Sequence, residues 1–221
     1  MSWVKSAVHS SVGGKFIVAV TGLLLVLFLV AHLAGNLLIF QGPEAMDAYA
    51  RQLRSLGGLL WIARIGLLLI AFLHVGLALR LNAANKDARP VPYAKKIYLN
   101  ATLPSRTMLP TGLCLLSFIL FHLADFTLRI TRGEYQTIAT ENVYQMVVAG
   151  FSNPFHATIY ILAMIALGMH LNHGISSLAQ TLGWNHPKYN SIFKWSGPIL
   201  GTLLALGFIS IPVSVLLGVV Q

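Results

Sequence analysis

Histidine stands inside four stretches of the sequence that are otherwise almost wholly apolar, at His32, His74, His122 and His170. A further histidine, His173, follows about one helical turn after His170. For a single residue of this kind, the ordinary explanation is a neutral imidazole that is hydrogen-bonded to a neighbouring helix. One histidine in each of four consecutive apolar stretches instead indicates a shared function, because ionisable residues in such segments are rare and usually functional. Imidazole is also a common metal ligand.

The apolar stretches that carry these histidines are long enough to cross a membrane. The chain has 221 residues, of which 56% are hydrophobic and 10% charged, and its mean hydropathy is +0.73; soluble domains carry roughly 25% charged residues. Each stretch approaches the ~20 residues that span a bilayer, and a backbone in lipid must form its hydrogen bonds within one segment, which favours helices. We therefore predict an all-α integral membrane bundle, a single domain over residues 1–221, with five transmembrane helices at roughly 15–40, 57–81, 107–130, 154–180 and 191–219.

The net charge of +9 comes from lysine and arginine in the segments between the spans. These cations are not interleaved with aromatic residues, so no nucleic-acid partner is expected. Cys114, the single cysteine, lies within a predicted span and cannot form an intrachain disulfide. The first apolar block is too long for a signal peptide. Between the spans, Pro43 suits a helix start, Gly57 and Gly58 mark a break, and a short surface helix is expected to end near Gly150.

Positive charge predicts the orientation of the bundle, since cytoplasmic loops are enriched in lysine and arginine. One side of the bundle carries ten such residues, which are Lys5, Lys15, Arg80, Lys86, Arg89, Lys95, Lys96, Arg106, Lys188 and Lys194. The opposite side carries four, which are Arg51, Arg54, Arg129 and Arg132. The N-terminus is therefore expected in the cytoplasm and, with five spans, the C-terminus outside. The remaining cation, Arg64, falls inside the second predicted span.

This orientation places the four histidines at two depths. At about 1.5 Å per residue, His32 lies ~25 Å along its helix, and His122 lies ~22 Å along a helix that runs the same way. Both are expected near the outer face. His74 and His170 lie about as far along helices that run the other way, which places them near the inner face. The histidines therefore form an outer pair and an inner pair.

An internal repeat supports the outer pair. The segments TGLLLVLFLVAHLA (21–34) and TGLCLLSFILFHLA (111–124) share eight identities in fourteen positions, at an offset of 90 residues. Leucine accounts for much of this agreement by chance, but the Thr-Gly, Phe and His-Leu-Ala matches are more specific. The two helices are thus expected to present histidine in the same local environment at the same height.

Two histidines from facing helices can occupy both axial positions of one haem iron, and helical bundles hold such cofactors between facing helices. A zinc site would need three or four ligands at one depth, so two layers of two histidines fit two haems better. Arg64 and Arg106 are candidate partners of the haem propionates, with interfacial snorkelling as the alternative. Glycines near the histidines would let a flat macrocycle approach, although small residues also serve ordinary helix packing; these are Gly35, Gly76, Gly168 and Gly174.

Four motifs, FLVAHLAGN, AFLHVGLAL, ILFHLADFTLRI and HLNHGISSLAQTLGW, occur in this order along the chain. They resemble the five-helix, di-haem cytochrome b membrane anchor of succinate:menaquinone oxidoreductases and fumarate reductases, over nearly the whole chain. In that family a ligand histidine precedes a helix end that bears tryptophan or glycine. The spacing from His170 to Gly183 and Trp184 fits this pattern and implies that His170 is the ligand. Because residues at i and i+3 share a helix face, His173 stays open as an alternative.

The resemblance implies two b haems, the outer one bound by His32 and His122 and the inner one by His74 and His170. It also implies a flavoprotein subunit with FAD and an iron–sulfur subunit on the cytoplasmic face of a bacterial inner membrane. Succinate or fumarate chemistry would take place on the flavoprotein, and chemistry of menaquinone or another quinone on or next to this chain. The direction of the reaction and a higher oligomer of the whole complex stay open. The remaining histidines, which are not expected to bind haem, are His9, His156 and His186.

No catalytic residue can be named from the sequence, and the quinone site is less well defined than the haem sites. Candidates at outer depth are Asp125 and Glu44, and candidates at the inner edge are Lys15, Arg106 and Trp184. Asp125 equally suits a helix cap or an ion pair with Arg129 one turn later. Two other classes of protein stay open. One is a di-haem cytochrome b of another quinone-linked dehydrogenase, of formate dehydrogenase or hydrogenase type. The other is a haem-free anchor or transporter whose histidines pack or relay protons.

Overall fold

The computed structural model describes residues 10–88, 91, 101–184 and 186–221. Four of the cations that predict the orientation, Lys5, Arg89, Lys95 and Lys96, lie outside the described residues, as does His9. Within this part of the chain all regular secondary structure is helical, and five helices are long and apolar enough to cross a membrane. The prediction of an all-α, multi-pass membrane protein is therefore confirmed.

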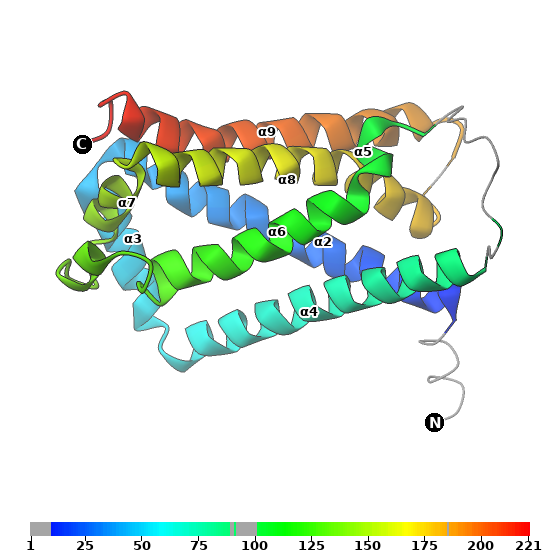
Figure 1. The fold of residues 1–221 in the computed structure, drawn as a ribbon, viewed down its shortest axis with the longest axis horizontal. Helices are drawn as coiled ribbons and strands as arrows, with labels where there is room; N and C mark the ends of the chain where they lie inside the picture. Colours follow the sequence, from blue (N-terminus) through cyan, green and yellow to red (C-terminus); the bar gives the residue numbers. More distant parts are fainter. Residues whose placement is uncertain (1–9, 89–90, 92–100, 185) are drawn as a thin grey trace.

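The five long helices run along one common direction (Figure 1). They are α2 (Ser11–Asn36), α4 (Gly58–Asp87), α6 (Met108–His122), α8 (Pro154–Thr181) and α9 (Asn190–Leu216). Two of them continue in another helical form: α2 passes into a 3₁₀ helix, η1 (Leu37–Gln41), and α6 passes into a π-helix, η2 (Leu123–Thr127). Helix α4 extends to Asp87, beyond the predicted end at residue 81, because alanine and lysine favour helix after the apolar run has ended.

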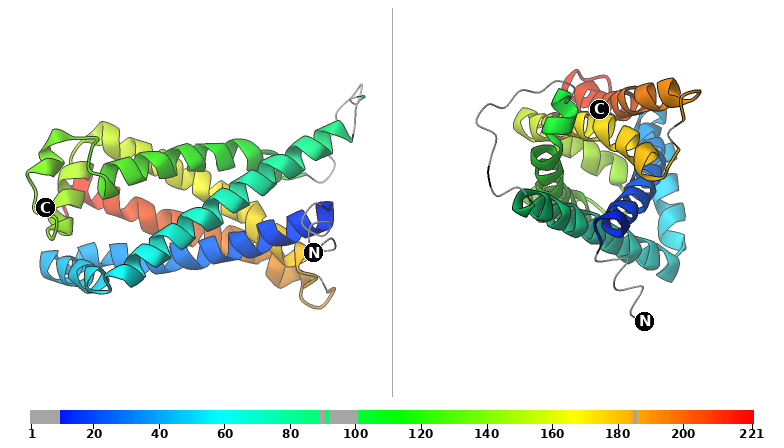
Figure 2. Two further views of the ribbon diagram at one scale, coloured as in Figure 1. Left: turned by 90° about the horizontal axis from the view of Figure 1, so that it is seen from below. Right: turned by 90° about the vertical axis from the view of Figure 1, so that its right-hand side faces the viewer.

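Helices α8 and α9 pack closely together because glycine removes side chains from their interface. A Cβ atom on Gly197 would lie 2.1 Å from the carbonyl oxygen of Asn172, and one on Gly201 would lie 2.9 Å from that of Gly168. Small residues of this kind let two membrane helices approach each other. Helix α2 packs against α4 and α8, and α6 packs against α8. Viewed along the bundle, α2, α4, α6 and α8 therefore surround its axis (Figure 2).

One end of the bundle, here called the capped end, is closed by α3 (Pro43–Ser55), η3 (Gly133–Gln136) and α7 (Val143–Phe151) (Figure 1). Asp47 Oδ1 accepts a hydrogen bond of 2.9 Å from the backbone N–H of Tyr144, which joins α3 to α7. The Tyr144 hydroxyl in turn donates to the carbonyl of Gln221 over 3.0 Å. Buried apolar residues fill this end, including Ile39, Met46, Val147, Phe151, Ile211 and Val215.

The connecting segments largely follow the sequence-based predictions. Pro43 is the first residue of α3, and Gly57, with φ of 53°, directly precedes α4. The short helix expected near Gly150 is α7, but the expectation that it lies on the surface is wrong, since Met146, Val147 and Phe151 are buried. Its apolar residues pack against the capped end. The C-terminus lies at the capped end and the start of α2 at the opposite end (Figure 1), as an odd number of spans requires; which end faces the cytoplasm stays a prediction.

Candidate functional site

Helices α2 and α6 bring the rings of His32 and His122 together in the half of the bundle next to the capped end. Their ring centroids are 5.9 Å apart and the ring planes are nearly perpendicular, at 82°. Phe208 of α9 lies beside His32, and Phe118 lies beside His122. The imidazoles therefore meet in an apolar, aromatic environment inside the bundle. The structure thus brings together the two residues that the sequence assigns to the outer pair.

The separation of these rings suits two ligands of one metal. Bonds between a metal and an imidazole nitrogen are about 2 Å long, so two imidazoles on opposite sides of one ion have ring centres about 6 Å apart. The observed 5.9 Å between His32 and His122 is close to this value. Asn36 lies 3.4 Å from both ring nitrogens of His32 and donates at 2.8 Å to the His32 carbonyl, so its amide does not favour one tautomer of this histidine.

The inner histidines, His74 and His170, are each held by a threonine of a neighbouring helix. His74 Nδ1 lies 3.1 Å from Thr21 Oγ1 and 3.1 Å from the carbonyl of Val18. His170 Nδ1 lies 3.3 Å from Thr111 Oγ1. Thr21 and Thr111 occupy matching positions of α2 and α6, so the two inner histidines lie at the same level of the bundle. The second predicted pair therefore lies in the half of the bundle away from the capped end.

The threonine contacts define which nitrogen of each inner histidine carries hydrogen. Thr21 donates its hydroxyl hydrogen to the carbonyl of Ile17 over 2.7 Å, and Thr111 donates to that of Thr107 over 2.7 Å. A hydroxyl has one hydrogen to donate, so towards histidine each threonine oxygen acts as an acceptor. Nδ1 of each inner histidine therefore carries the hydrogen, and Nε2 keeps the lone pair that a metal needs. A hydrogen bond from the other ring nitrogen is the usual support of a metal-bound imidazole.

The two Thr-Gly pairs of the internal repeat lie directly against the inner histidines. A Cβ atom on Gly22 would lie 3.1 Å from Cε1 of His74, and one on Gly112 would lie 3.2 Å from Cε1 of His170. Each of α2 and α6 thus carries an outer histidine and, eleven positions earlier, a Thr-Gly surface for an inner histidine. The repeat shows only that each Thr-Gly pair precedes an outer histidine on the same helix. It does not show that the Thr-Gly pairs contact the inner histidines, because those lie on other helices, α4 and α8.

The structure distinguishes His170 from His173. The His170 ring lies against Thr111 and Gly112 of α6, whereas in the described part of the chain no hydrogen bond holds the His173 ring. Although the two residues are one turn apart on α8, only His170 has the support that a ligand needs. The geometry therefore favours His170, in agreement with the assignment that the resemblance implies.

A buried carboxylate lies next to the outer pair. Asp125, in the π-helix η2 immediately after His122, is 0% exposed. Its Oδ2 accepts hydrogen bonds from the Tyr160 hydroxyl over 2.6 Å and from His156 Nε2 over 2.5 Å, and its Oδ1 accepts from the Thr131 hydroxyl. Short π-helical segments are rare and frequently occur at functional sites. The carboxylate is thus fixed by three side-chain donors without contact with solvent.

The alternative ion pair between Asp125 and Arg129 is wrong. The Arg129 guanidinium donates instead to the carbonyls of Tyr135 and Ile138. Arg129 has a φ of 59°, a conformation that few residues other than glycine adopt. The chain therefore leaves the helical path at Arg129, and its side chain holds the following loop rather than the acid one turn earlier.

His156 and Tyr160 are site residues that sequence reasoning missed. The sequence predicts only that His156 does not bind haem, and it gives no indication of the contact with Asp125. The two residues are four positions apart on α8 and therefore lie on one face. Asn153 caps the start of this helix by accepting a hydrogen bond of 3.1 Å from the backbone N–H of His156. The i, i+4 spacing of two polar residues at the start of an apolar helix was the available signal.

The remaining quinone candidates are scattered. Glu44 is exposed in the first turn of α3 at the capped end, whereas Lys15 is exposed near the start of α2 at the opposite end. Trp184 is 50% exposed and stacks on Phe193, with ring centroids 6.3 Å apart. Asp125 is enclosed, and protein donors occupy both of its carboxylate oxygens. The structure does not bring these residues together.

The two candidate propionate partners lie at opposite ends of the bundle. Arg64 is exposed in α4, with its guanidinium 5.2 Å from the centre of the Trp61 ring. Arg106 is exposed at the end of α5 (Leu103–Arg106), at the end of the bundle away from the cap. Each is therefore in the half of the bundle that contains one histidine pair.

The four glycines that the sequence places near the histidines differ in their surroundings. A Cβ atom on Gly35 would lie 2.5 Å from the Tyr49 ring, and one on Gly168 would lie 3.2 Å from Cβ of Ala205. These two glycines therefore serve helix packing. A Cβ atom on Gly76 or Gly174 would meet no other atom within 4 Å, so only these two leave free space beside the backbone.

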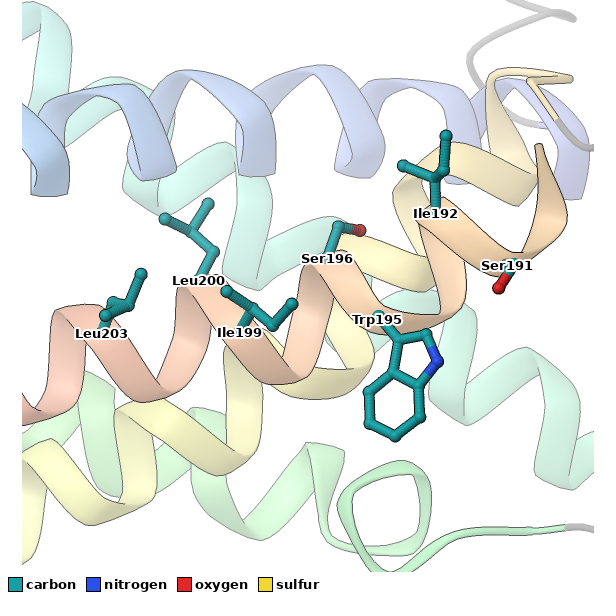
Figure 3. A pocket seen from close by; sticks show the side chains of 7 residues that line it. All are labelled: Ser191, Ile192, Trp195, Ser196, Ile199, Leu200 and Leu203. Carbon is teal, nitrogen blue, oxygen red and sulfur yellow. The ribbon is translucent and has the colours of Figure 1, made fainter.

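A shallow apolar depression runs along α9 (Figure 3). It is lined by Ser191, Ile192, Trp195, Ser196, Ile199, Leu200 and Leu203. Lipid tails are as apolar as these side chains, so this surface suits contact with the bilayer. It offers no group that could bind an iron or exchange a proton.

In the described ranges, no three His, Cys, Asp or Glu side chains converge to form a metal site by themselves. A haem iron takes at most two ligands from the protein, so this finding concerns zinc-like sites and does not bear on the haem prediction. Comparisons with protein-family models, curated proteins and solved structures found no match.

Proposed function

We propose that this chain is a di-haem cytochrome b that carries electrons within the membrane. The observation that supports this best is the arrangement of four histidines in two layers, one residue from each of α2, α4, α6 and α8. His32 and His122 would hold the haem nearer the capped end. His74 and His170 would hold the other haem.

The surroundings of the histidines support this role. A haem iron held between two imidazoles accepts and releases one electron. The residues of this chain would keep each imidazole in one orientation, since Thr21 and Thr111 fix the ring of an inner histidine and leave Nε2 available. The step of eleven positions from Thr21 to His32 separates the two layers by about 16 Å along α2. Two sites stacked in this way would form a path for electrons across the bilayer.

We further propose that the chain is the membrane subunit of a succinate dehydrogenase or fumarate reductase in a bacterial inner membrane. The order and spacing of the four histidine motifs support this assignment. A flavoprotein with FAD and an iron–sulfur subunit would bind at the end opposite the cap, where Lys86 and Arg106 are exposed. Menaquinone or another quinone would exchange electrons next to the chain. Arg64 and Arg106 suit the haem propionates by their charge and by their place in opposite halves of the bundle.

The proposal is tested by the haem content of the native complex. After reduction with dithionite, the purified protein is expected to show the α band of b-type haem, with two haems per chain. His32→Ala and His122→Ala should each remove one haem, the same one, and leave the other. His170→Ala should remove the second haem, whereas His173→Ala, a matched control one turn away, should keep both.

Three results would contradict the proposal at different levels. A protein without haem would point to the haem-free anchor or transporter. Loss of both haems from every single substitution would contradict the two-site arrangement. Haem that succinate reduces, together with a co-purifying flavoprotein, is the outcome expected for the succinate dehydrogenase or fumarate reductase class. A molybdenum or nickel–iron partner would instead indicate a subunit of formate dehydrogenase or hydrogenase type.

A further inference from the structure

A chain of hydrogen bonds connects His122 to the buried carboxylate of Asp125. The Tyr160 hydroxyl oxygen lies 3.4 Å from His122 Nδ1, at the long end of hydrogen-bonding distance, and 2.6 Å from Asp125 Oδ2. A phenol has one hydrogen to donate, and a carboxylate can only accept. Tyr160 therefore donates to Asp125 and can only accept from His122. It follows that Nδ1 of His122 carries the hydrogen and that Nε2 keeps its lone pair.

The surroundings of this chain hold it in place. His156 and Thr131 donate to the same carboxylate, which is fully enclosed. The Tyr160 ring packs against Phe151, with centroids 4.9 Å apart, and against Phe118, with centroids 5.0 Å apart. These aromatic rings hold Tyr160 in place, with its hydroxyl directed at Asp125 and His122. Hydrogen bonds in such apolar surroundings are electrostatically stronger than in water.

We propose that Asp125 and Tyr160 are positioning residues that fix the tautomer of His122 and make its Nε2 a stronger electron donor. This inference rests on the proposed function, because it takes His122 as a ligand of the outer haem. A carboxylate behind a metal-bound imidazole raises the basicity of the ligand. A more basic ligand, with a buried negative charge behind it, stabilises ferric over ferrous iron and lowers the reduction potential of that haem.

The inner histidines provide an internal comparison. His74 and His170 are supported by the neutral hydroxyls of Thr21 and Thr111. In the described part of the chain no carboxylate is hydrogen-bonded to either threonine. The effect of Asp125 should therefore fall on the outer haem and leave the inner haem unchanged.

The test is a redox titration of both haems in the purified complex with its native partners. Asp125→Asn keeps the size of the side chain but removes its charge, and Tyr160→Phe removes the connecting hydroxyl. Each is expected to raise the midpoint potential of the outer haem. A tenfold change in its reduced-to-oxidised ratio corresponds to about 59 mV for one electron. The low-spin ferric electron paramagnetic resonance signal of the outer haem should change in the same variants.

Tyr144→Phe is the matched control, because it deletes the same atom from a tyrosine at the capped end whose hydroxyl bonds to Gln221. It should shift neither potential. If Asp125→Asn does not accumulate, Tyr160→Phe decides, since it retains the carboxylate. A wild-type complex without haem would overturn the proposed function and this inference together. A wild-type complex with two haems, whose outer potential stays the same in Tyr160→Phe or whose two potentials shift equally, would overturn this inference alone.

Discussion

Replacing Thr111 with valine should weaken the inner haem site and leave the outer site intact. Valine keeps the shape of threonine but removes the oxygen that accepts from His170 Nδ1 at 3.3 Å. A buried N–H group that loses its partner costs about 1–3 kcal/mol. At 1.4 kcal/mol per factor of ten, this corresponds to about 5- to 150-fold weaker haem binding at the inner site. The range agrees with the usual effect of losing the outer partner of a metal ligand, about 10- to 100-fold.

The assay is competition for haem between the purified protein and a soluble haem-binding protein, followed by the spectrum of each bound haem. Thr158→Val is the matched control. The Thr158 hydroxyl bonds to the carbonyl four residues earlier over 2.7 Å, as that of Thr111 does, but in the described part of the chain it is hydrogen-bonded to no histidine. Thr111→Val should release the inner haem at a lower competitor concentration than Thr158→Val. Equal retention in the two variants, or preferential loss of the outer haem, would refute the assignment of Thr111 to His170.

Two further predictions concern packing and pH. Gly197→Ala should destabilise the protein by about 1–3 kcal/mol in thermal unfolding, because its Cβ atom would lie 2.1 Å from the carbonyl oxygen of Asn172. Gly76→Ala is the control and should not destabilise the protein, because its Cβ atom would meet no atom of a neighbouring helix within 4 Å. Burial, followed by the charge of Asp125, raises the pKa of Tyr135 in the capped-end loop. Folding stability should therefore fall as pH rises above about 10, the ordinary pKa of tyrosine, because the unfolded state loses this proton first. This fall, measured as the unfolding midpoint between pH 8 and 11, should be smaller in Tyr135→Phe. An identical pH profile in the two proteins would contradict the raised pKa of Tyr135.

Hydropathy was sufficient to predict the five spans, because burial in lipid selects long apolar helices. It could not predict where α4 ends. Hydropathy marks where a helix leaves the bilayer, whereas Asp87 ends a helix that continues on the propensity of its residues. The two layers of histidines were also predictable, since depth follows from residue number once the direction of each helix is known. The faces that the helices turn towards one another do not follow from residue number.

The supporting residues of the site were not predictable for the same reason. Thr21 and Thr111 were visible as part of a repeat, but their contacts lie on α4 and α8, which the repeat does not include. Asp125 was a candidate for the quinone, yet its partners depend on the π-helical turn after His122, which no pattern in the sequence indicates. Tyr160 and His156 acquire a role only once that turn directs the carboxylate towards α8.

The spacing between Thr-Gly and histidine on α2 and α6 sets how far apart the two layers of histidines lie and how they are rotated relative to each other. Eleven residues are close to three full turns of an α-helix, so Thr21 and His32 lie on nearly the same face, as do Thr111 and His122. One inserted or deleted residue between them would turn one layer by about 100° relative to the other. Neither layer could then be redesigned by changing helix length without disturbing the other. The distance between the two sites is thus set by the number of residues within one helix, and it does not depend on how tightly neighbouring helices pack.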